Sequence, residues 1–197
     1  MAKLLYQGHG SFRITADDGR VIYIDPYAGE GYDLPADIIL VSHQHGDHNQ
    51  IGLVTQKPNC RIITEKESLA GGTHNTFDLG GIDIVAVEAG GNKGHDVTNS
   101  VGYIITLENV TVYASGDTSY VPGMEKLAAQ GVDYALLCCD GIYNMDVIEA
   151  ARCAKLIGAK HNIPIHMKPK ALFDRKIAES FDAPNRIILE AGETLDL

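Results

Sequence analysis

The residues best suited to chemistry in this chain lie in one short run, His43-Gln44-His45-Gly46-Asp47-His48. Imidazole nitrogen and carboxylate oxygen are ligands that a borderline divalent ion such as zinc prefers. Because His43 and His45 alternate along the chain, they can face one ion, while Asp47 and His48 turn toward a second. The spacing is too specific for an ordinary solvated loop, so the run predicts a metal site.

Three further residues offer the same ligand chemistry: His95, Asp117 and His166. Each follows an apolar run, and these runs span residues 82–87, 110–114 and 162–165. A single such residue is more often a helix cap or a satisfied polar group than a ligand. Ligands collect beyond the strand ends of α/β sheets, and all three residues recur at that place. We therefore expect them to join the metal site.

The elements that must position these residues are short strands and a few helices. A continuous apolar run at 37–42 is typical of a strand buried on both faces, and it ends at His43. Gly and Asp turn signals separate the other apolar runs. The predicted strands are 12–15, 21–24, 61–64, 82–87, 101–107, 110–114, 134–139, 162–165 and 186–189. The predicted helices are 121–130, 146–157 with Asp146 as its N-cap, and 173–181.

Length and composition predict one domain, residues 1–197, with sheet inside and helices outside. Apolar residues make up 45% of the chain, an ordinary share for a globular protein. The formal net charge is −10, and an acidic surface repels phosphate backbones, so a nucleic-acid partner is not expected. No apolar run approaches the length of a membrane span. The four cysteines have no C-x-x-C spacing and are expected to be free thiols, which favours a cytoplasmic protein.

The order of these motifs resembles the metallo-β-lactamase superfamily. The resemblance rests on residues 43–48, on His95, on Gly116-Asp117-Thr118 and on Ile163-Pro164-Ile165-His166. Gly8-His9-Gly10-Ser11-Phe12 and Tyr23-Ile24-Asp25-Pro26 look like the opening of its small stand-alone hydrolases. Within the superfamily, the ascorbate-6-phosphate lactonase-like branch is the most similar. The resemblance implies an α/β (α+β) fold, a four-layer αββα sandwich with metals at one edge between two sheets.

The resemblance also implies a ligand set for two divalent ions, Zn²⁺ in the first place with Mn²⁺ as the alternative. One ion would be held by His43, His45 and His95, and the other by Asp47, His48 and His166. Asp117 would bridge them, and Asp47 is the ligand also expected to act in catalysis. The nucleophile would be a metal-bound hydroxide. Asp25 would either orient a ligand histidine or serve only as a turn residue before Pro26.

We therefore expect a metal-dependent hydrolase that attacks an ester-like bond of a small molecule: a lactone, a thioester or a phosphoester. One alternative is a di-iron redox protein of the same fold, although that branch typically has glutamate where His45 stands. Another is a non-catalytic metal-binding scaffold, although such members would be expected to lose ligands. The substrate and the oligomeric state, including a homo-oligomer, are left open by the sequence.

Four residues near these motifs have no assigned role. His9 lies in the opening segment, from which it could reach the metal pocket, but it is left out of the ligand set. Lys170 belongs to a local basic patch after His166 that would attract a small anion. Asn144 stands where the family usually has threonine, which leaves the substrate contacts open. Tyr143 is either a proton donor to a leaving group or a packing residue.

Overall fold

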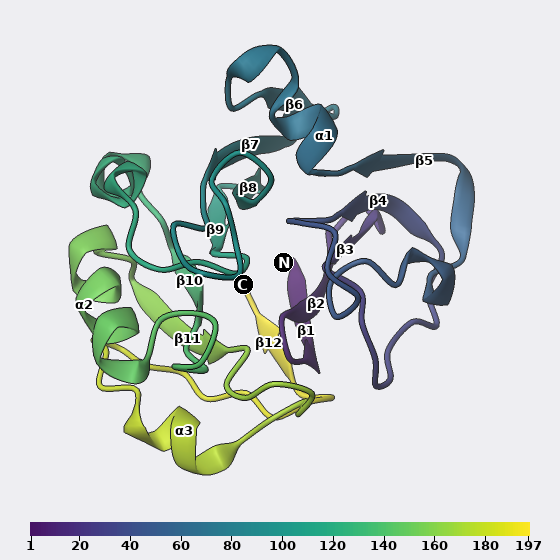
Figure 1. Cartoon of the computed structure of the whole chain (residues 1–197). Coiled ribbons are helices and arrows are strands. Elements are labelled where there is room, and N and C mark those ends of the chain that lie inside the picture. The colour runs from purple at the N-terminus through teal and green to yellow at the C-terminus, as the bar shows by residue number, and fades with distance from the viewer.

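Two mixed β-sheets face each other in the computed structural model, which describes residues 1–197 (Figure 1). The first sheet has the order β12-β1-β2-β3-β4-β5. Its strands are β1 (Lys3–Gly8), β2 (Ser11–Thr15), β3 (Val21–Ile24), β4 (Ala36–Leu40), β5 (Gln56–Ile63) and β12 (Thr194–Asp196). The second has the order β11-β10-β9-β8-β7-β6. Its strands are β6 (Thr76–Asp78), β7 (Ile82–Glu88), β8 (Val101–Leu107), β9 (Val110–Ala114), β10 (Tyr134–Cys138) and β11 (His161–Ile165).

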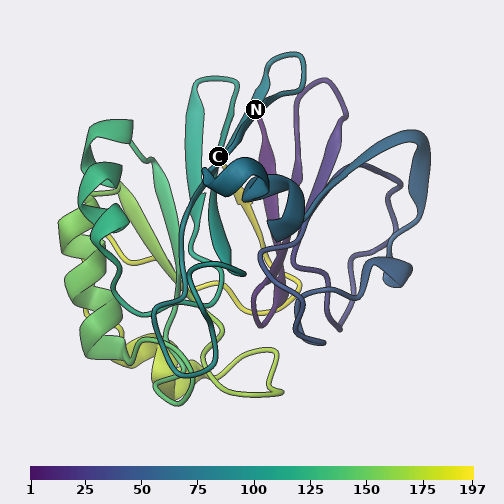
Figure 2. The ribbon, with the colours of Figure 1, turned by 45° about the horizontal axis from the view of Figure 1, so that its top comes forward.

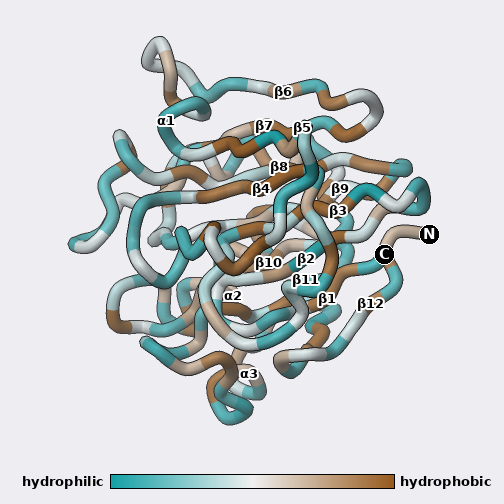
Figure 3. The backbone as a smooth tube through the Cα atoms, turned by 90° about the vertical axis from the view of Figure 1, so that its right-hand side faces the viewer, coloured by the Kyte–Doolittle hydropathy of each residue, from teal (hydrophilic) through white to brown (hydrophobic).

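The main hydrophobic core lies between the two sheets and contains 25 buried residues from both of them. Alternate residues of β1 and β2, such as Leu4, Tyr6 and Phe12, point into it and are fully buried. Brown, hydrophobic stretches run along strands at the centre of the molecule, while teal, hydrophilic stretches are frequent in the outer loops (Figure 3). Burial of this apolar surface is the main force that holds the sheets together.

Helices cover only one of the two outer faces. The helices α2 (Val147–Ile157) and α3 (Arg175–Ser180) and a 3-10 helix (Pro122–Gln130) pack on the outer face of the second sheet (Figures 1 and 2). On the first sheet, a smaller cluster is closed by loop residues such as Tyr32 and by a 3-10 helix, Ile51–Leu53. The short helix α1 (Glu65–Ser68) and a 3-10 turn (Ala70–Gly72) follow β5. The predicted αββα sandwich is confirmed, with one outer layer reduced to loops and short turns.

Two predicted elements are corrected by the structure. The segment 122–130 is a 3-10 helix rather than an α-helix, although it ends at Gly131 as predicted, in a left-handed conformation. Residues 186–189 do not form a strand, because they make a single bridge, from Arg186 to Asn162, and then leave the sheet edge. The strands β1, β6 and β12 were not predicted from the sequence. No helix has the length and hydropathy that a membrane crossing requires.

Strand direction explains where the site forms. In the first sheet β1, β3 and β4 run the same way, since β2 is antiparallel to both β1 and β3 while β3 and β4 are parallel. In the second sheet β7, β9, β10 and β11 share one direction by the same reasoning. Every candidate site residue lies in a loop that follows the carboxyl end of one of these strands. The loops therefore meet at one edge of the sandwich.

Candidate metal centre

The seven predicted ligands lie in one cluster at this edge. Their ligand atoms fall into three overlapping groups, and within each group all atoms are within 4.8 Å of one another. One group contains His43, His45 and His95, and a second contains His43, His48 and Asp117. The third contains Asp47, His48 and His166 together with His9, which the sequence analysis had left out. The structure thus brings together all seven predicted residues and adds an eighth.

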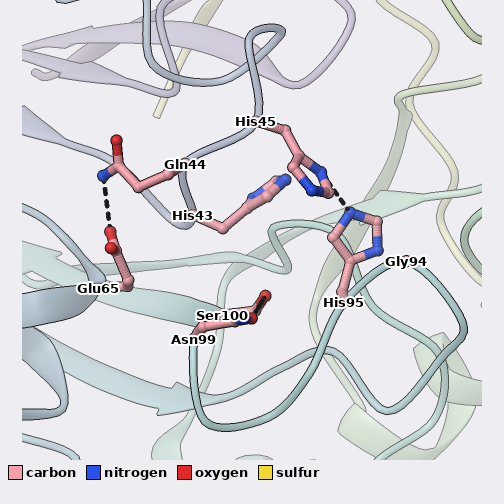
Figure 4. Close-up of a pocket in the computed structure, with 8 residues that line it drawn as sticks. All are labelled: His43, Gln44, His45, Glu65, Gly94, His95, Asn99 and Ser100. Carbon is pink, nitrogen blue, oxygen red and sulfur yellow. Dashed lines mark hydrogen bonds between the residues drawn. The ribbon is translucent and has the colours of Figure 1, made fainter.

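Three histidines form the more open side of the cluster. His43, His45 and His95 point toward one another, and Nδ1 of His45 lies 3.1 Å from Nε2 of His95 (Figure 4). His43 and His95 are buried, whereas His45 is exposed. Convergence of imidazole nitrogens from loops of two different sheets is the arrangement expected of a divalent metal site.

Asp117 occupies the middle of the cluster. Its Oδ1 lies 3.3 Å from Nε2 of His48, and its Oδ2 lies 3.3 Å from Nε2 of both His95 and His166. The carboxylate therefore faces the three-histidine group on one side and the group of Asp47 on the other. This is the position that a bridging ligand would need.

The far nitrogens of the ligand histidines are held by other side chains. Asp25 lies 2.8 Å from Nδ1 of His48, and Ser42 Oγ, which donates to Asp25, lies 3.0 Å from Nδ1 of His43. Asn92 Oδ1 lies 2.9 Å from Nδ1 of His95. A partner on Nδ1 fixes the tautomer and leaves Nε2 with its lone pair toward the cluster. Asp25 thus contacts one candidate ligand histidine directly and another through Ser42, the geometry that the first of its two predicted roles requires.

His166 is supported by a residue that sequence reasoning missed. Asp140 Oδ2 lies 3.1 Å from Nδ1 of His166, and its Oδ1 accepts backbone N–H groups from Ile142, Tyr143 and Asn144. The amide of Asn144 donates to Asp140 as well. The unusual Asn144 thus supports the carboxylate behind His166. Asp140 lies just after the buried strand β10. The same kind of position indicated His95, Asp117 and His166 as candidate ligands, so it could have indicated Asp140 as well.

Buried polar atoms without partners show that a cation fits here. Nε2 of His43, His48 and His166 and Oδ1 of Asp117 are buried and make no hydrogen bond. Burying such atoms without a partner is costly, and it is rare away from functional sites. All four atoms face the cluster, and all are nitrogen or oxygen donors that suit divalent transition metals. The donor set therefore matches a metal centre.

The charges of the cluster suit metal binding. Burial, reinforced by the nearby His48, lowers the pKa of His43 to about 2, so this ring is neutral. Burial alone would raise the pKa of Asp117, but His48 and His166 outweigh it and hold that pKa well below its ordinary value. Burial would likewise lower the pKa of His166, but Asp117 dominates and raises it to about 9. Protons on His48 and His166 thus balance the negative charge of Asp117. Metal cations bound between these residues would balance it in the same way.

Left-handed backbone marks the same edge. His9, Asp25 and His166 have φ angles of 57°, 46° and 45°, and each directly follows a strand. Such angles are uncommon outside glycine, although Asp and His tolerate them better than most residues. Conformations of this kind concentrate at functional sites, where the surrounding structure holds them in place.

Comparison with known proteins identifies the family. A family model described as the beta-lactamase superfamily domain matches residues 3–166. The chain belongs to the metallo-β-lactamase superfamily. A UPF0173 metal-dependent hydrolase of Pyrococcus furiosus is 30% identical, and the alignment covers 100% of both chains. A second one, from Alkaliphilus metalliredigens, is 32% identical over 83% of this chain and 84% of its own.

Solved structures agree on the fold of this superfamily member. Igni18, a metallo hydrolase from Ignicoccus hospitalis, superposes with a TM-score of 0.77 at 23% identity, covering 98% of this chain and 97% of its own. The predicted superfamily and the predicted enzyme class, a metal-dependent hydrolase, are confirmed. The narrower ascorbate-6-phosphate lactonase-like branch stays a prediction.

Two pockets adjoin the metal centre of this hydrolase. A pocket of about 130 Å³ lies beside the three histidines and has no hydrophobic lining residue; Gln44 donates to Glu65 across it (Figure 4). A larger pocket of about 360 Å³ is lined by His45, Asp47, Gly94, His95, Asp117, Tyr143, His166, Pro169 and Lys170. Because the larger pocket combines candidate ligands of both groups with residues of two outer loops, it is the candidate substrate site.

Proposed function

We propose that this protein is a dinuclear metallohydrolase, with zinc as its ion and manganese as the alternative. Its substrate is a small molecule with an ester-like bond: a lactone, a thioester or a phosphoester. The observation that carries this proposal is the convergence of seven candidate ligands, Asp117 and the six residues around it. Four of them, His43, His48, Asp117 and His166, turn a buried atom without a hydrogen-bond partner toward the cluster.

The ligands divide between the two ions according to their groups. His43, His45 and His95 would hold one, and Asp47, His48 and His166 the other, with Asp117 shared between them. When bound, two such cations lower the pKa of a water molecule toward neutrality and stabilise developing negative charge. Asp47, whose side chain is 36% exposed, lines the larger pocket, so this carboxylate both completes the ligand set and faces the substrate.

The larger pocket supports a small, negatively charged substrate. Its volume of about 360 Å³ lies within the range of small-molecule sites, roughly 300–1,000 Å³. Lys170 is the one lysine or arginine in its lining, is exposed and forms no ion pair. Its ammonium group is free to bind an anionic group of the substrate. Tyr143 lies in the same lining and is 56% exposed, so its phenol is available to a leaving group.

A reducing compartment fits the thiols of this chain. Cys60, Cys138, Cys139 and Cys153 are free, as the sequence analysis predicted. Free thiols persist in reducing compartments, and we propose the cytoplasm as the place where the hydrolase works.

The test is metal analysis followed by an activity screen. Protein loaded separately with Zn²⁺ and Mn²⁺ would be analysed for metal content and assayed against lactones, thioesters, phosphomonoesters and phosphodiesters. We expect about two ions per chain and turnover of one of these classes.

Two results would contradict the proposal. Iron as the native metal together with redox activity would indicate a di-iron redox protein. Two bound ions without turnover in any class would favour the non-catalytic scaffold. A variant with both His43 and His95 replaced by alanine serves as the control for hydrolysis by contaminating enzymes, because it removes two ligands of one ion.

A further inference from the structure

His9 is a buried histidine to which the proposed mechanism gives no role. It directly follows β1, its side chain has no exposed surface, and its ring centroid lies 3.7 Å from that of His166. Its ring nitrogens contact two groups, the carbonyl of Ala171 and the carboxylate of Asp47. These two contacts show which group each ring nitrogen faces.

The contact with Ala171 fixes the tautomer of His9. Nδ1 lies 3.0 Å from the backbone oxygen of Ala171. A carbonyl oxygen only accepts hydrogen bonds, so Nδ1 must carry the proton and donate it. In the neutral ring Nε2 then has a lone pair, which is the form in which histidine binds a metal.

The lone pair of His9 Nε2 faces the ligand group that contains Asp47. Nε2 of His9 lies 3.2 Å from Oδ2 of Asp47, and a carboxylate oxygen is also an acceptor. Two acceptors at this distance are stabilised by a cation shared between them. Nε2 of His9 and the ligand atoms of Asp47, His48 and His166 all lie within 4.8 Å of one another. We propose that His9 is a direct ligand of the second metal ion, an inference that rests on the proposed dinuclear centre.

The backbone holds His9 in place for this role. Its N–H donates to the carbonyl of Leu172 at 2.7 Å, and its own carbonyl accepts from the N–H of His166 at 2.8 Å and from the hydroxyl of Tyr6 at 2.9 Å. These bonds fix its left-handed conformation, with φ at 57°. A ring positioned before the ion arrives loses little conformational entropy on binding.

The extra ligand makes the two ions unequal. With His9, the protein supplies five ligands to the second ion: His9, Asp47, His48, His166 and the shared Asp117. The first ion has His43, His45, His95 and Asp117. A zinc site closed by protein ligands is typically structural, whereas a catalytic site keeps a position open. The first ion, with one protein ligand fewer and with the exposed His45 beside both pockets, therefore has the more open coordination, although the larger pocket also reaches Asp47 and His166 of the second.

Cadmium NMR tests this ligand directly. Protein labelled with ¹⁵N-histidine and loaded with ¹¹³Cd would show a one-bond Cd–N coupling for each ligand ring. Three histidines at each ion predict couplings from six of the eight histidines, including Nε2 of His9. Two cadmium resonances with no coupling to His9 would overturn this inference and leave the dinuclear proposal intact. A single cadmium resonance would overturn both.

A variant gives a second, independent measurement. His9→Gln keeps an amide that donates a hydrogen bond but removes the imidazole. We expect its affinity for the second cadmium ion to fall by ~10-fold or more while the first site is preserved. His74→Gln, at an exposed position outside the cluster, is the matched control. Unchanged affinity for the second ion in His9→Gln would contradict a ligand role. The NMR measurement on the unsubstituted protein does not depend on how this variant folds.

Discussion

Asp25 connects to residues of both proposed ligand groups. Its Oδ1 accepts the backbone N–H of Ser42 at 2.7 Å, and its Oδ2 lies 2.6 Å from the Ser42 hydroxyl and 2.8 Å from Nδ1 of His48. The same hydroxyl contacts Nδ1 of His43. One buried carboxylate therefore orients a histidine in each ligand group, directly for His48 and through Ser42 for His43.

Replacing Asp25 with asparagine should weaken metal binding without removing a ligand. The amide has one acceptor oxygen, so its NH₂ group must face a group that now donates to Oδ1 or to Oδ2: the Ser42 N–H in one orientation, the Ser42 hydroxyl and His48 in the other. We expect ~10- to 100-fold weaker binding, measured by competition with a chromophoric chelator. Asp33→Asn is the control, because Asp33 is exposed and pairs only with Arg13. Wild-type affinity in Asp25→Asn would show that the residue acts only in the turn before Pro26.

Replacing Asp117 with asparagine tests the bridging role. The change removes the negative charge but keeps the shape, and two nearby dications repel each other unless an anion lies between them. We expect the second ion to be lost or bound far more weakly, while the three-histidine ion is retained. Hydrolysis should fall by at least ~100-fold, since it depends on both cations.

The measurements for Asp117→Asn are metal stoichiometry and turnover, with Asp33→Asn again as the control. Stoichiometry matters most here, because lost turnover alone would also result from local misfolding. If Asp117→Asn keeps two tightly bound ions and near-normal turnover, Asp117 does not bridge them.

At the level of elements, the turn between β1 and β2 presses against a ligand. A Cβ atom placed on Gly10 would lie 2.8 Å from Cε1 of His48, a ring that is buried and held by Asp25. A side chain at this position would therefore have to displace the His48 ring, which favours glycine here.

We therefore expect Gly10→Ala to displace the His48 ring and lower affinity for the second ion by ~10-fold or more. Overpacking should also lower the free energy of unfolding by roughly 1–3 kcal/mol. Gly52→Ala is the matched control, because a Cβ there meets nothing within 4 Å. Isothermal titration with metal and urea unfolding measure the two effects. Equal behaviour of the two variants would mean that the turn tolerates the added methyl group.

The elements that the sequence predicted best are those with strong local patterns. The central strands β4, β8, β9 and β10 appear as buried apolar runs, and α2 begins at the predicted cap, Asp146, whose Oδ1 accepts two backbone N–H groups. The strand β12 is only three residues long and pairs with β1 from the other end of the chain. No local pattern indicates such an edge strand, because its extended conformation depends on hydrogen bonds to β1, which is distant in the sequence.

The site residues, like the elements, were predictable where a local sequence pattern marks them. His95, Asp117 and His166 were predictable because each lies beyond a buried strand, and all strand ends of one direction meet at one edge. The role of His9 was not predictable, since it depends on Ala171, which is 162 residues away in the sequence. A tautomer is set by whichever loop reaches the far nitrogen, and the sequence does not show which loop that is.

At the level of the whole molecule, the net charge of −10 opposes an anionic substrate. Lys170 is a local exception at the larger pocket. We expect Lys170→Ala to raise KM by ~10-fold for an anionic substrate and to leave KM nearly unchanged for a neutral analogue of the same bond class. Lys66→Ala, which removes an exposed lysine outside both pockets of the metal centre, is the control. An equal change for the charged and neutral substrates would exclude charge recognition by Lys170.

The metal centre also joins the two halves of the sandwich. His43, His45, Asp47 and His48 come from the loop after β4 in the first sheet, whereas His95, Asp117 and His166 follow strands of the second. The core between the sheets contains none of these ligand residues. Removing metal should therefore leave the protein folded but less stable, because binding to the folded state alone stabilises it by mass action.

Thermal unfolding tests this coupling. At free metal 100 times the dissociation constant, one site contributes about 2.7 kcal/mol to the free energy of unfolding, and chelation removes that contribution. We expect EDTA to lower the Tm and re-added Zn²⁺ to restore it. The Asp117→Asn protein should show a smaller increase on metal addition, because it retains one site, while Asp33→Asn should respond like the unsubstituted protein. A Tm that is independent of metal in the unsubstituted protein would mean that the seven ligands bind no ion tightly in the folded state.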